Sequence, residues 1–391
     1  MSVPRGWASW LMGLATICLL GAALARAQTP SAAPAGQKPI LSEQAFKNVT
    51  VLRGIPVKEF METMGFFSAA LAYNCSDCHG STSSWSDYAS DNPVKQTARR
   101  MMLMVNALNR ANFGGAPAVT CNTCHRGSPR PEAIPSLARQ YGAPLERDPD
   151  TIEPNPRVPV RMTAERILDR YIEAVGGAAA AASLTSYTAK GTSEGFDSNY
   201  QQVPLEVHAQ APDKRTTVVH MPAGDSVTTY DGQEAWAAGP PDLTPVTLIS
   251  LVDDTLDGVR LDAQLAFPGQ IKQILTDWRT GYPPLEIDGR RVDVIDGRTP
   301  RKGRVKLYFD NETGVLVRSV RYSTTAVGTV PITVVYSNYR EVPGLRVRIP
   351  YTWEVIWTNG RSTYNITSLQ PNVAIDAGRF GRPTPPRQAA N

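Results

Sequence analysis

Apolar residues recur every three to four positions in two stretches near the start of the chain. They are Val57, Phe60, Met61, Met64, Phe67 and Leu71 in the first stretch, and Val94, Ala98, Met101, Val105 and Leu108 in the second. This spacing places apolar side chains on one face of an α-helix. Pro56 and Pro93 stand where the patterns begin, and proline is favoured in a first helical turn. The pattern therefore predicts two amphipathic helices.

A third helical pattern starts after Thr163 and ends at Gly176-Gly177. Beyond it the apolar positions alternate with period two, which is typical of strands. The clearest runs are residues 305–309, 315–320, 332–336 and 351–357. Turn pairs such as Asn359-Gly360 separate the runs and predict hairpins, and one helix is expected at residues 262–278. The expected fold class is α+β, with a small, mainly helical domain followed by a mainly antiparallel β domain.

Composition predicts the domain boundaries. Residues 1–27 have a basic start, an apolar core and the cleavage pattern Ala25-Arg26-Ala27, so we expect an export signal peptide and a periplasmic protein. If the signal is not cleaved, it would anchor the chain to the membrane. The remaining predicted segments are a disordered leader at 28–46, the helical domain at 47–132, a Pro-rich linker at 133–162, the β domain at 163–380 and a tail at 381–391.

Each of the first two predicted helices is followed by the pattern Cys-x-x-Cys-His, which is the attachment signal for a c-type haem. Four cysteines in an exported protein could instead form two disulfides or one zinc site. The histidine after both pairs favours haem, because the chain has only four histidines. We therefore predict two covalent haems c. Their thioether cysteines are Cys75, Cys78, Cys121 and Cys124, and their proximal iron ligands are His79 and His125.

The sixth iron ligand decides between electron transfer and catalysis. His208 and His220 lie in strand-like runs far along the chain, where we expect ordinary strand histidines. Five of the nine methionines lie on the two helices that precede the motifs: Met61, Met64, Met101, Met102 and Met104. Methionines on an apolar helix face are also common core residues. The residues alone leave both interpretations open.

Charge adds two expectations. The net charge of +4 comes from 40 basic and 36 acidic residues without a dense basic stripe, so no nucleic-acid partner is expected. Lys95, Arg99 and Arg100 lie on the second predicted helix. They would contact haem propionates or form a solvated helix face, and the sequence does not separate these alternatives.

A family resemblance covers about residues 47–132. The pattern Ala98-Arg99-Arg100-Met101…Met104…Asn109, followed by residues 120–127 and Pro131, resembles the cytochrome subunit of purple-bacterial photosynthetic reaction centres, as does the segment 57–64. In that family each Met-ligated haem takes its methionine from the helix before its own motif. The resemblance therefore implies Met101 for the second haem and Met64, with Met61 as the alternative, for the first. The family subunit has four haems and a lipid-anchor cysteine, whereas this chain has two motifs and no such cysteine.

The second domain carries a looser resemblance. Residues 337–350 and 372–380 are similar to the curved half-barrel of LolA-like periplasmic lipoprotein carriers. The resemblance implies an antiparallel half-barrel. Such a domain would either bind a lipid or a quinone in a hydrophobic concavity or serve as a rigid scaffold for the haem domain.

These expectations combine into one function. A neutral thioether ligand raises the haem potential and fills the last iron position, so we expect an electron-transfer protein and no enzyme. The expected partners are redox proteins, such as a membrane reaction centre or a respiratory complex, with peripheral membrane association. The alternatives are a dihaem peroxidase-type enzyme, which needs a five-coordinate haem, and a haem-containing lipid or quinone carrier.

Overall fold

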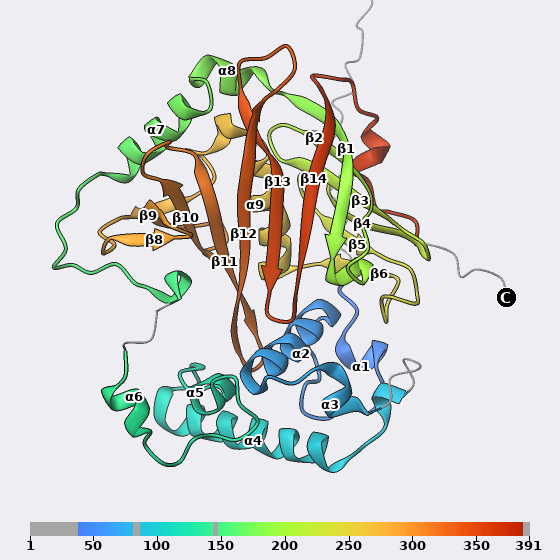
Figure 1. Cartoon of the computed structure of the whole chain (residues 1–391). Helices are drawn as coiled ribbons and strands as arrows, with labels where there is room; N and C mark the ends of the chain where they lie inside the picture. Colours follow the sequence, from blue (N-terminus) through green and yellow to red (C-terminus); the bar gives the residue numbers. More distant parts are fainter. Residues whose placement is uncertain (1–37, 81–86, 144–147, 386–391) are drawn as a thin grey trace, which may run out of the picture. The chain divides into compact units, whose positions relative to one another are not determined.

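The computed structural model describes residues 38–80, 87–143 and 148–385 (Figure 1). The predicted signal peptide, most of the predicted leader and the end of the predicted tail lie outside these residues. These described residues all belong to one compact unit. The helices and the sheet described below therefore belong to a single body.

The first described part of the chain is helical. Its helices are α1 Ser42–Ala45, α2 Val57–Leu71, α3 Cys75–His79, α4 Pro93–Phe113, α5 Cys121–His125 and α6 Leu137–Tyr141, with the 3-10 turn η1 Asp87–Ala89 between α3 and α4. Both predicted amphipathic helices are confirmed. Helix α4 begins at Pro93 after Asn92, whose side chain accepts a hydrogen bond from the Lys95 amide at 3.0 Å. It ends at Gly114, whose positive φ of 60° is a conformation that glycine adopts without strain.

Three further helices flank the sheet: α7 Ala164–Ala174, α8 Ala178–Ser183 and α9 Asp253–Leu265. The helix predicted at 262–278 is misplaced, because α9 starts earlier and residues 276–279 form a strand. Two acidic residues stand in the first turn of α9, where they favour a helix start. The helix ends at Leu265, and Pro268 begins the 3-10 turn η4 (Pro268–Gln270). The apolar residues after Pro268, namely Ile271, Ile274 and Leu275, have the three-to-four-residue spacing of a helical stripe. All three are buried, but they reach the core from a turn.

The strands among the described residues form one 14-stranded sheet in which neighbours are antiparallel, which confirms the α+β class and the predicted meander. The strand order is β6-β5-β4-β3-β2-β1-β14-β13-β12-β11-β10-β9-β7, with β8 paired to β9. The strands are β1 Ser186–Gly195, β2 Val203–Gln210, β3 Lys214–Met221, β4 Gly224–Tyr230, β5 Ala235–Ala238, β6 Leu248–Leu251, β7 Thr276–Arg279, β8 Leu285–Ile287, β9 Arg290–Arg298, β10 Arg304–Asp310, β11 Leu316–Thr325, β12 Gly328–Glu341, β13 Arg348–Trp357 and β14 Gly360–Pro371.

The sheet curves around α9. This helix contacts β3 and β4 on one side and β11 on the other, although five strands separate β3 from β11 in the sheet. A flat sheet would not allow one helix to touch both groups. The largest apolar cluster lies on the enclosed side, and Leu261, Phe267 and Ile271 are among its buried members. Side chains of α9 and of the turn after it therefore fill the concave face.

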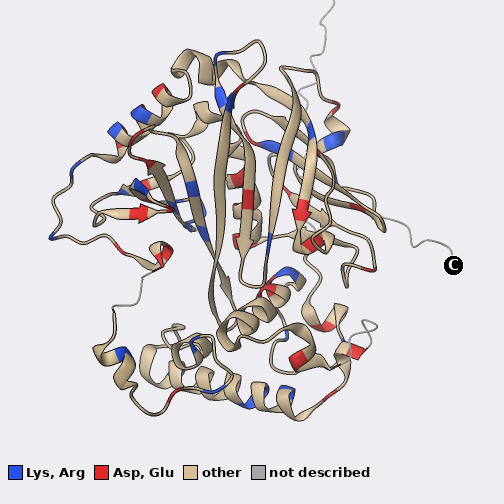
Figure 2. Cartoon of the chain, in the orientation of Figure 1, with Lys and Arg blue, Asp and Glu red and all other residues tan. Residues whose placement is uncertain are grey.

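A strap of chain, residues 148–158, is fastened to strands β10–β12 by buried polar groups. Its 3-10 turn η2 (Pro149–Thr151) is acidic, whereas the strands beneath carry lysine and arginine (Figure 2). Lys306 is fully buried, and its ammonium donates to the Asp150 and Ile152 carbonyls, both at 2.7 Å. Arg318 donates to the Asp150 carboxylate at 2.7 Å. This part of the predicted Pro-rich linker is thus a strap held on the sheet.

We expect the substitution Lys306→Met to lower the free energy of unfolding by about 1–3 kcal/mol. Methionine keeps most of the side-chain volume, but the Ile152 carbonyl would lose the Lys306 donor, and the Asp150 carbonyl would keep only the Tyr322 hydroxyl. The matched control is Lys190→Met, because Lys190 is exposed and its nearest charge partner, Glu206, lies 3.6 Å away. The control should leave stability nearly unchanged. Denaturant unfolding of both variants measures the difference, and equal stabilities would contradict the buried network.

Candidate haem sites

The first Cys-x-x-Cys-His motif forms α3, a helix of a single turn that begins directly after Asn74. The Asn74 side chain accepts from the Asp77 amide at 3.1 Å, and the Asp77 carboxylate accepts from the Asn74 amide at 2.8 Å. This reciprocal capping satisfies two amide groups that the short helix leaves unpaired. Asn74 and Asp77 therefore fix the start of the turn that holds Cys75 and Cys78.

His79 ends this helix in a defined orientation. Its Nδ1 lies 3.2 Å from the Tyr88 carbonyl oxygen, and the two rings lie 4.7 Å apart. A carbonyl oxygen only accepts, so Nδ1 carries the hydrogen and Nε2 keeps the lone pair that binds a metal. Burial, together with the nearby Lys95 ammonium, lowers the pKa of His79 and favours this neutral form.

The second motif, α5, repeats the arrangement. Nδ1 of His125 lies 2.9 Å from the Ser128 carbonyl oxygen, which again leaves Nε2 free. The Gly127 amide donates to the Ala70 carbonyl at 3.0 Å and so ties the end of the motif to α2. Helix α2, which precedes the first motif, thus packs against the second one, while α4 contacts both motif helices. The two motifs form one shared helical body.

The four motif cysteines are free thiols, and they are not joined as disulfides. Each pair has one half-buried member, Cys78 or Cys121, and one exposed member, Cys75 or Cys124. Burial raises the pKa of the Cys78 and Cys121 thiols. Within the described residues, no three His, Cys, Asp or Glu side chains are grouped so that they could hold a metal ion by themselves.

The methionines of α4 divide between two faces. Met102 is 6% exposed and packs in a cluster with Phe66, Val327 and Val330, whereas Met101 is 42% exposed. Met101 shares its face of the helix with other exposed apolar side chains, namely Val94, Met104 and Leu108. Periodicity alone did not separate Met101 from Met102, but the packing does.

The methionines of α2 are both half-buried. Met61 and Met64 lie among the residues of that helix that are partly covered, and Met64 packs against the same cluster as Met102. The structure therefore places Met64 beside the apolar cluster that α2 and α4 share. Both residues stay candidates for the first haem.

These residues fit a covalently attached porphyrin. Two adjacent thiols, one histidine with a free Nε2 and an apolar helix face carrying a thioether are the donors and the wall that such a group needs. The strongest observation is the exposed apolar face of α4, since a helix of a folded domain normally turns such a face inward. When bound, the haem iron supplies a reversible one-electron couple.

The basic residues of α4 have protein partners. Lys95 donates to the Tyr88 and Ser90 carbonyls at 2.7 and 2.5 Å, and Arg99 donates to the Asp91 carboxylate at 2.8 Å. Arg100 donates to the Thr97 hydroxyl at 2.9 Å. Contact of Lys95, Arg99 and Arg100 with haem propionates stays a prediction. The remaining histidines, His208 and His220, lie on β2 and β3 as predicted, next to Thr188 and Asp225 respectively.

The helical part rests on the tips of two hairpins of the sheet. A methyl group added at Gly65 of α2 would lie 2.6 Å from the Thr358 hydroxyl oxygen in the β13–β14 turn. A methyl group at Gly328, where β12 begins, would lie 2.8 Å from the Phe66 ring. These close approaches need glycine. The sheet therefore supports α2 directly.

A cavity of about 380 Å³ lies where α4, the approach to α5 and the β11–β12 tip meet. Cys121 lines it, and so does Arg110 in the last turn of α4. Sequence reasoning did not identify Arg110. No local pattern could have done so, because the cavity needs residues 324–327, more than 200 positions further along the chain.

The helical part of the chain thus brings together two Cys-x-x-Cys-His turns, their oriented histidines and the apolar face of α4. Residues 17–147 match the family model of the photosynthetic reaction centre cytochrome C subunit. The photosynthetic reaction center cytochrome c subunit of Rubrivivax gelatinosus is 34% identical over 111 residues, which are 27% of this chain and 28% of that protein. The predicted resemblance is confirmed for this segment, and the chain spans just over a quarter of the relative's length.

Solved structures with a similar course of the chain have low sequence identity. A DUF1329 family protein from Desulfovibrio piger is 10% identical with a TM-score of 0.39, covering 56% of this chain and 97% of its own. A LolA superfamily protein from Nitrosomonas europaea is 13% identical with a TM-score of 0.37, covering 56% of this chain and 98% of its own. Among the described residues, no helix is both long and apolar enough to cross a bilayer.

Proposed function

We propose that the chain is a periplasmic dihaem c-type cytochrome that relays single electrons. The observation that carries the proposal is the pair of motif histidines, each with Nδ1 next to a backbone carbonyl and Nε2 free. A histidine held in this way presents a neutral nitrogen to iron at a fixed angle. The same arrangement at both motifs supports one haem at each, with Cys75, Cys78, Cys121 and Cys124 as the covalent attachment points.

Methionine ligands would complete the two sites. Met101 lies on the exposed apolar face of α4, and Met64 lies on α2 beside the shared cluster. We assign Met101 to the second haem and Met64, with Met61 as the alternative, to the first. Two His/Met ligand pairs leave no open coordination position, so the chain would exchange electrons without binding peroxide or oxygen.

The residues around each site serve three tasks. The cysteines hold the group covalently, the carbonyls of Tyr88 and Ser128 keep the histidine rings in place, and the apolar face of α4 keeps water away. Because these partners are backbone atoms in the same compact unit, the iron ligands would move little when the charge on iron changes. Small reorganisation suits an electron relay.

The partner proposed is another redox protein. The relative from Rubrivivax gelatinosus is a reaction centre subunit, so a membrane reaction centre or a respiratory complex is the partner class we propose, with peripheral membrane association. The role of the sheet that fits best is a scaffold. Its concave face is filled by α9 and the turn after it, which disfavours a lipid or quinone carrier.

Optical spectroscopy of the full chain in both redox states tests the proposal. We expect low-spin spectra for oxidised and reduced protein and no turnover of hydrogen peroxide, because both irons would have six ligands. A high-spin component together with peroxide turnover would support the dihaem peroxidase-type alternative instead. A protein that binds no haem when expressed with a cytochrome c maturation system would contradict the proposal altogether.

A further inference from the structure

The β11–β12 hairpin tip, residues 324–327, forms one wall of the 380 Å³ cavity beside the second motif. On the opposite side stand residues of α4, namely Met102, Val105, Asn106, Asn109 and Arg110. Gly115, Pro117 and Cys121 close it from the approach to α5. The cavity is therefore built jointly by the helical part and the sheet, and one of its lining residues is a predicted haem-attachment cysteine.

The lining suits a porphyrin, which is largely apolar and also carries carboxylates. Met102, Val105 and Val327 give an apolar surface, and Arg110 adds a cation. Asn109 is committed to the fold, because its side chain donates to the Val119 carbonyl at 2.8 Å and accepts from the Val119 amide at 3.0 Å. This pair of hydrogen bonds fixes the loop that leads to Cys121. The cavity thus has a rigid floor next to the attachment point.

The hairpin tip is held rigidly as well. The Thr325 hydroxyl donates to the Gly328 carbonyl at 2.7 Å across the turn, and the Thr324 amide donates to the Asp254 carboxylate on α9 at 2.7 Å. Val327 and Val330 are buried together with Phe66 and Met102. The tip therefore keeps its place relative to α2 and α4.

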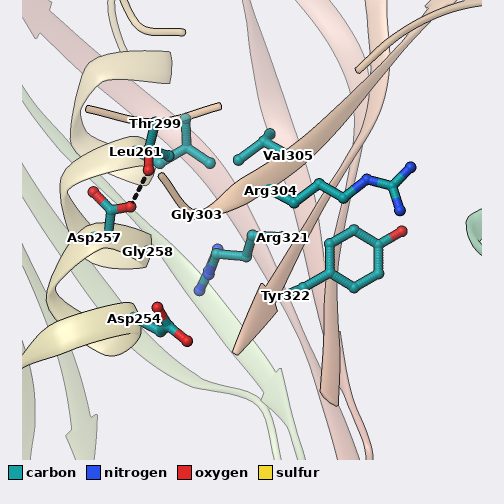
Figure 3. Close-up of a pocket in the computed structure, with 10 residues that line it drawn as sticks. All are labelled: Asp254, Asp257, Gly258, Leu261, Thr299, Gly303, Arg304, Val305, Arg321 and Tyr322. Atoms are coloured by element: carbon teal, nitrogen blue, oxygen red, sulfur yellow. Dashed lines mark hydrogen bonds between the residues drawn. The ribbon is translucent and has the colours of Figure 1, made fainter. Parts of the chain in front are cut away.

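Helix α9 in turn is fixed to the sheet near this tip. Figure 3 shows the Arg321 side chain extending from β11 toward Asp254 and Asp257 of α9, whereas the Tyr322 ring points away from the helix. Residues of both elements line one small pocket. The Thr299 hydroxyl donates to Asp257, and Arg321 donates to the Asp262 carboxylate at 2.8 Å. At about 10 Å³ this pocket has room for a single water molecule. The hydrogen bonds from Arg321 to Asp262 and from Thr324 to Asp254 hold α9 against β11 and so support the tip.

We propose that the β11–β12 tip is part of the second haem site, so that the sheet helps to set the potential of that haem. This inference rests on the proposed function. The sheet would then influence the haem potential as well as support α2, since the residue at position 326 lies at the wall of the site. Ala326 is exposed and lines the cavity, so its side chain can be changed without opening the core.

The test is a pair of variants of opposite charge, Ala326→Glu and Ala326→Lys, in the full haem-loaded chain. A nearby negative charge stabilises ferric iron and a positive charge stabilises ferrous iron. We expect the two variants to shift the ferric-to-ferrous ratio of one haem, at a fixed potential, by about tenfold in opposite directions, which equals 59 mV for a one-electron couple. The other haem should change less.

The matched control places the same two residues at Thr313, giving Thr313→Glu and Thr313→Lys. Thr313 is exposed in the β10–β11 turn, at the other end of the ten-residue strand β11 and so roughly 30 Å from the tip. Control variants should titrate like the unchanged protein. Equal titrations of the Ala326 pair and the control pair, in a protein that holds both haems, would overturn this inference alone. A chain that holds no haem would overturn the proposed function first.

Discussion

A chain in which Cys121 and Cys124 are both replaced by alanine is expected to carry one covalent haem instead of two. The thioether bonds are the only permanent link between the group and the chain, so their loss removes the second haem from protein purified under denaturing conditions. Intact-protein mass spectrometry counts the haems directly. We expect the first haem to stay, because Cys75 and Cys78 belong to a separate helical turn.

The reciprocal variant, with Cys75 and Cys78 replaced by alanine, is the matched control. It should lose the first haem and keep the second, and a chain lacking all four cysteines should carry none. The β-sheet signal in circular dichroism should persist in all three variants, since most of the buried apolar core belongs to the sheet and its helices. Retention of two haems by either double variant would contradict the assignment of the motifs.

The substitution Met101→Leu is expected to lower the midpoint potential of one haem by on the order of 0.1–0.3 V, a fraction of the roughly 0.8 V that axial ligands span. A thioether ligand stabilises ferrous iron. Leucine keeps the apolar volume but removes this ligand, so the potential should fall. Redox titration followed optically measures the shift. The same change at Met64 should lower the potential of the other haem.

Met104→Leu is the control for this prediction. Met104 is 53% exposed on the same side of α4 and differs from Met101 mainly in its position along the helix. It should leave both potentials nearly unchanged. If Met104→Leu lowers a potential and Met101→Leu does not, the ligand of the second haem is Met104 and the assignment from the family resemblance is wrong. An effect of Met61→Leu in place of Met64→Leu would likewise reassign the first haem.

Local patterns predicted the parts of this molecule that depend on neighbours in sequence. Helices α2 and α4 follow from a 3.6-residue period with proline at the start. The meander follows from period-two runs separated by turn pairs, because a hairpin joins strands that are adjacent in the chain. The motif histidines were predicted by spacing, and the structure adds the carbonyl partners that orient them.

Features that depend on distant contacts were not predictable in this way. Lys306 stands in an alternating run between Val305 and Leu307 and has the pattern of an exposed strand residue, yet the strap at residues 148–158 covers it completely. Arg110 became a candidate contact of the second haem only because it lines a cavity whose opposite wall is the β11–β12 tip. Helix α9 was misplaced because buried residues after Pro268 continue an apolar pattern that is no longer helical.

An equilibrium redox titration of the unchanged chain tests the central claim most directly. The account predicts that each chain takes up two electrons in two one-electron steps, with low-spin spectra at every potential. Uptake of one electron or none, or a single concerted two-electron step, would contradict a dihaem electron relay.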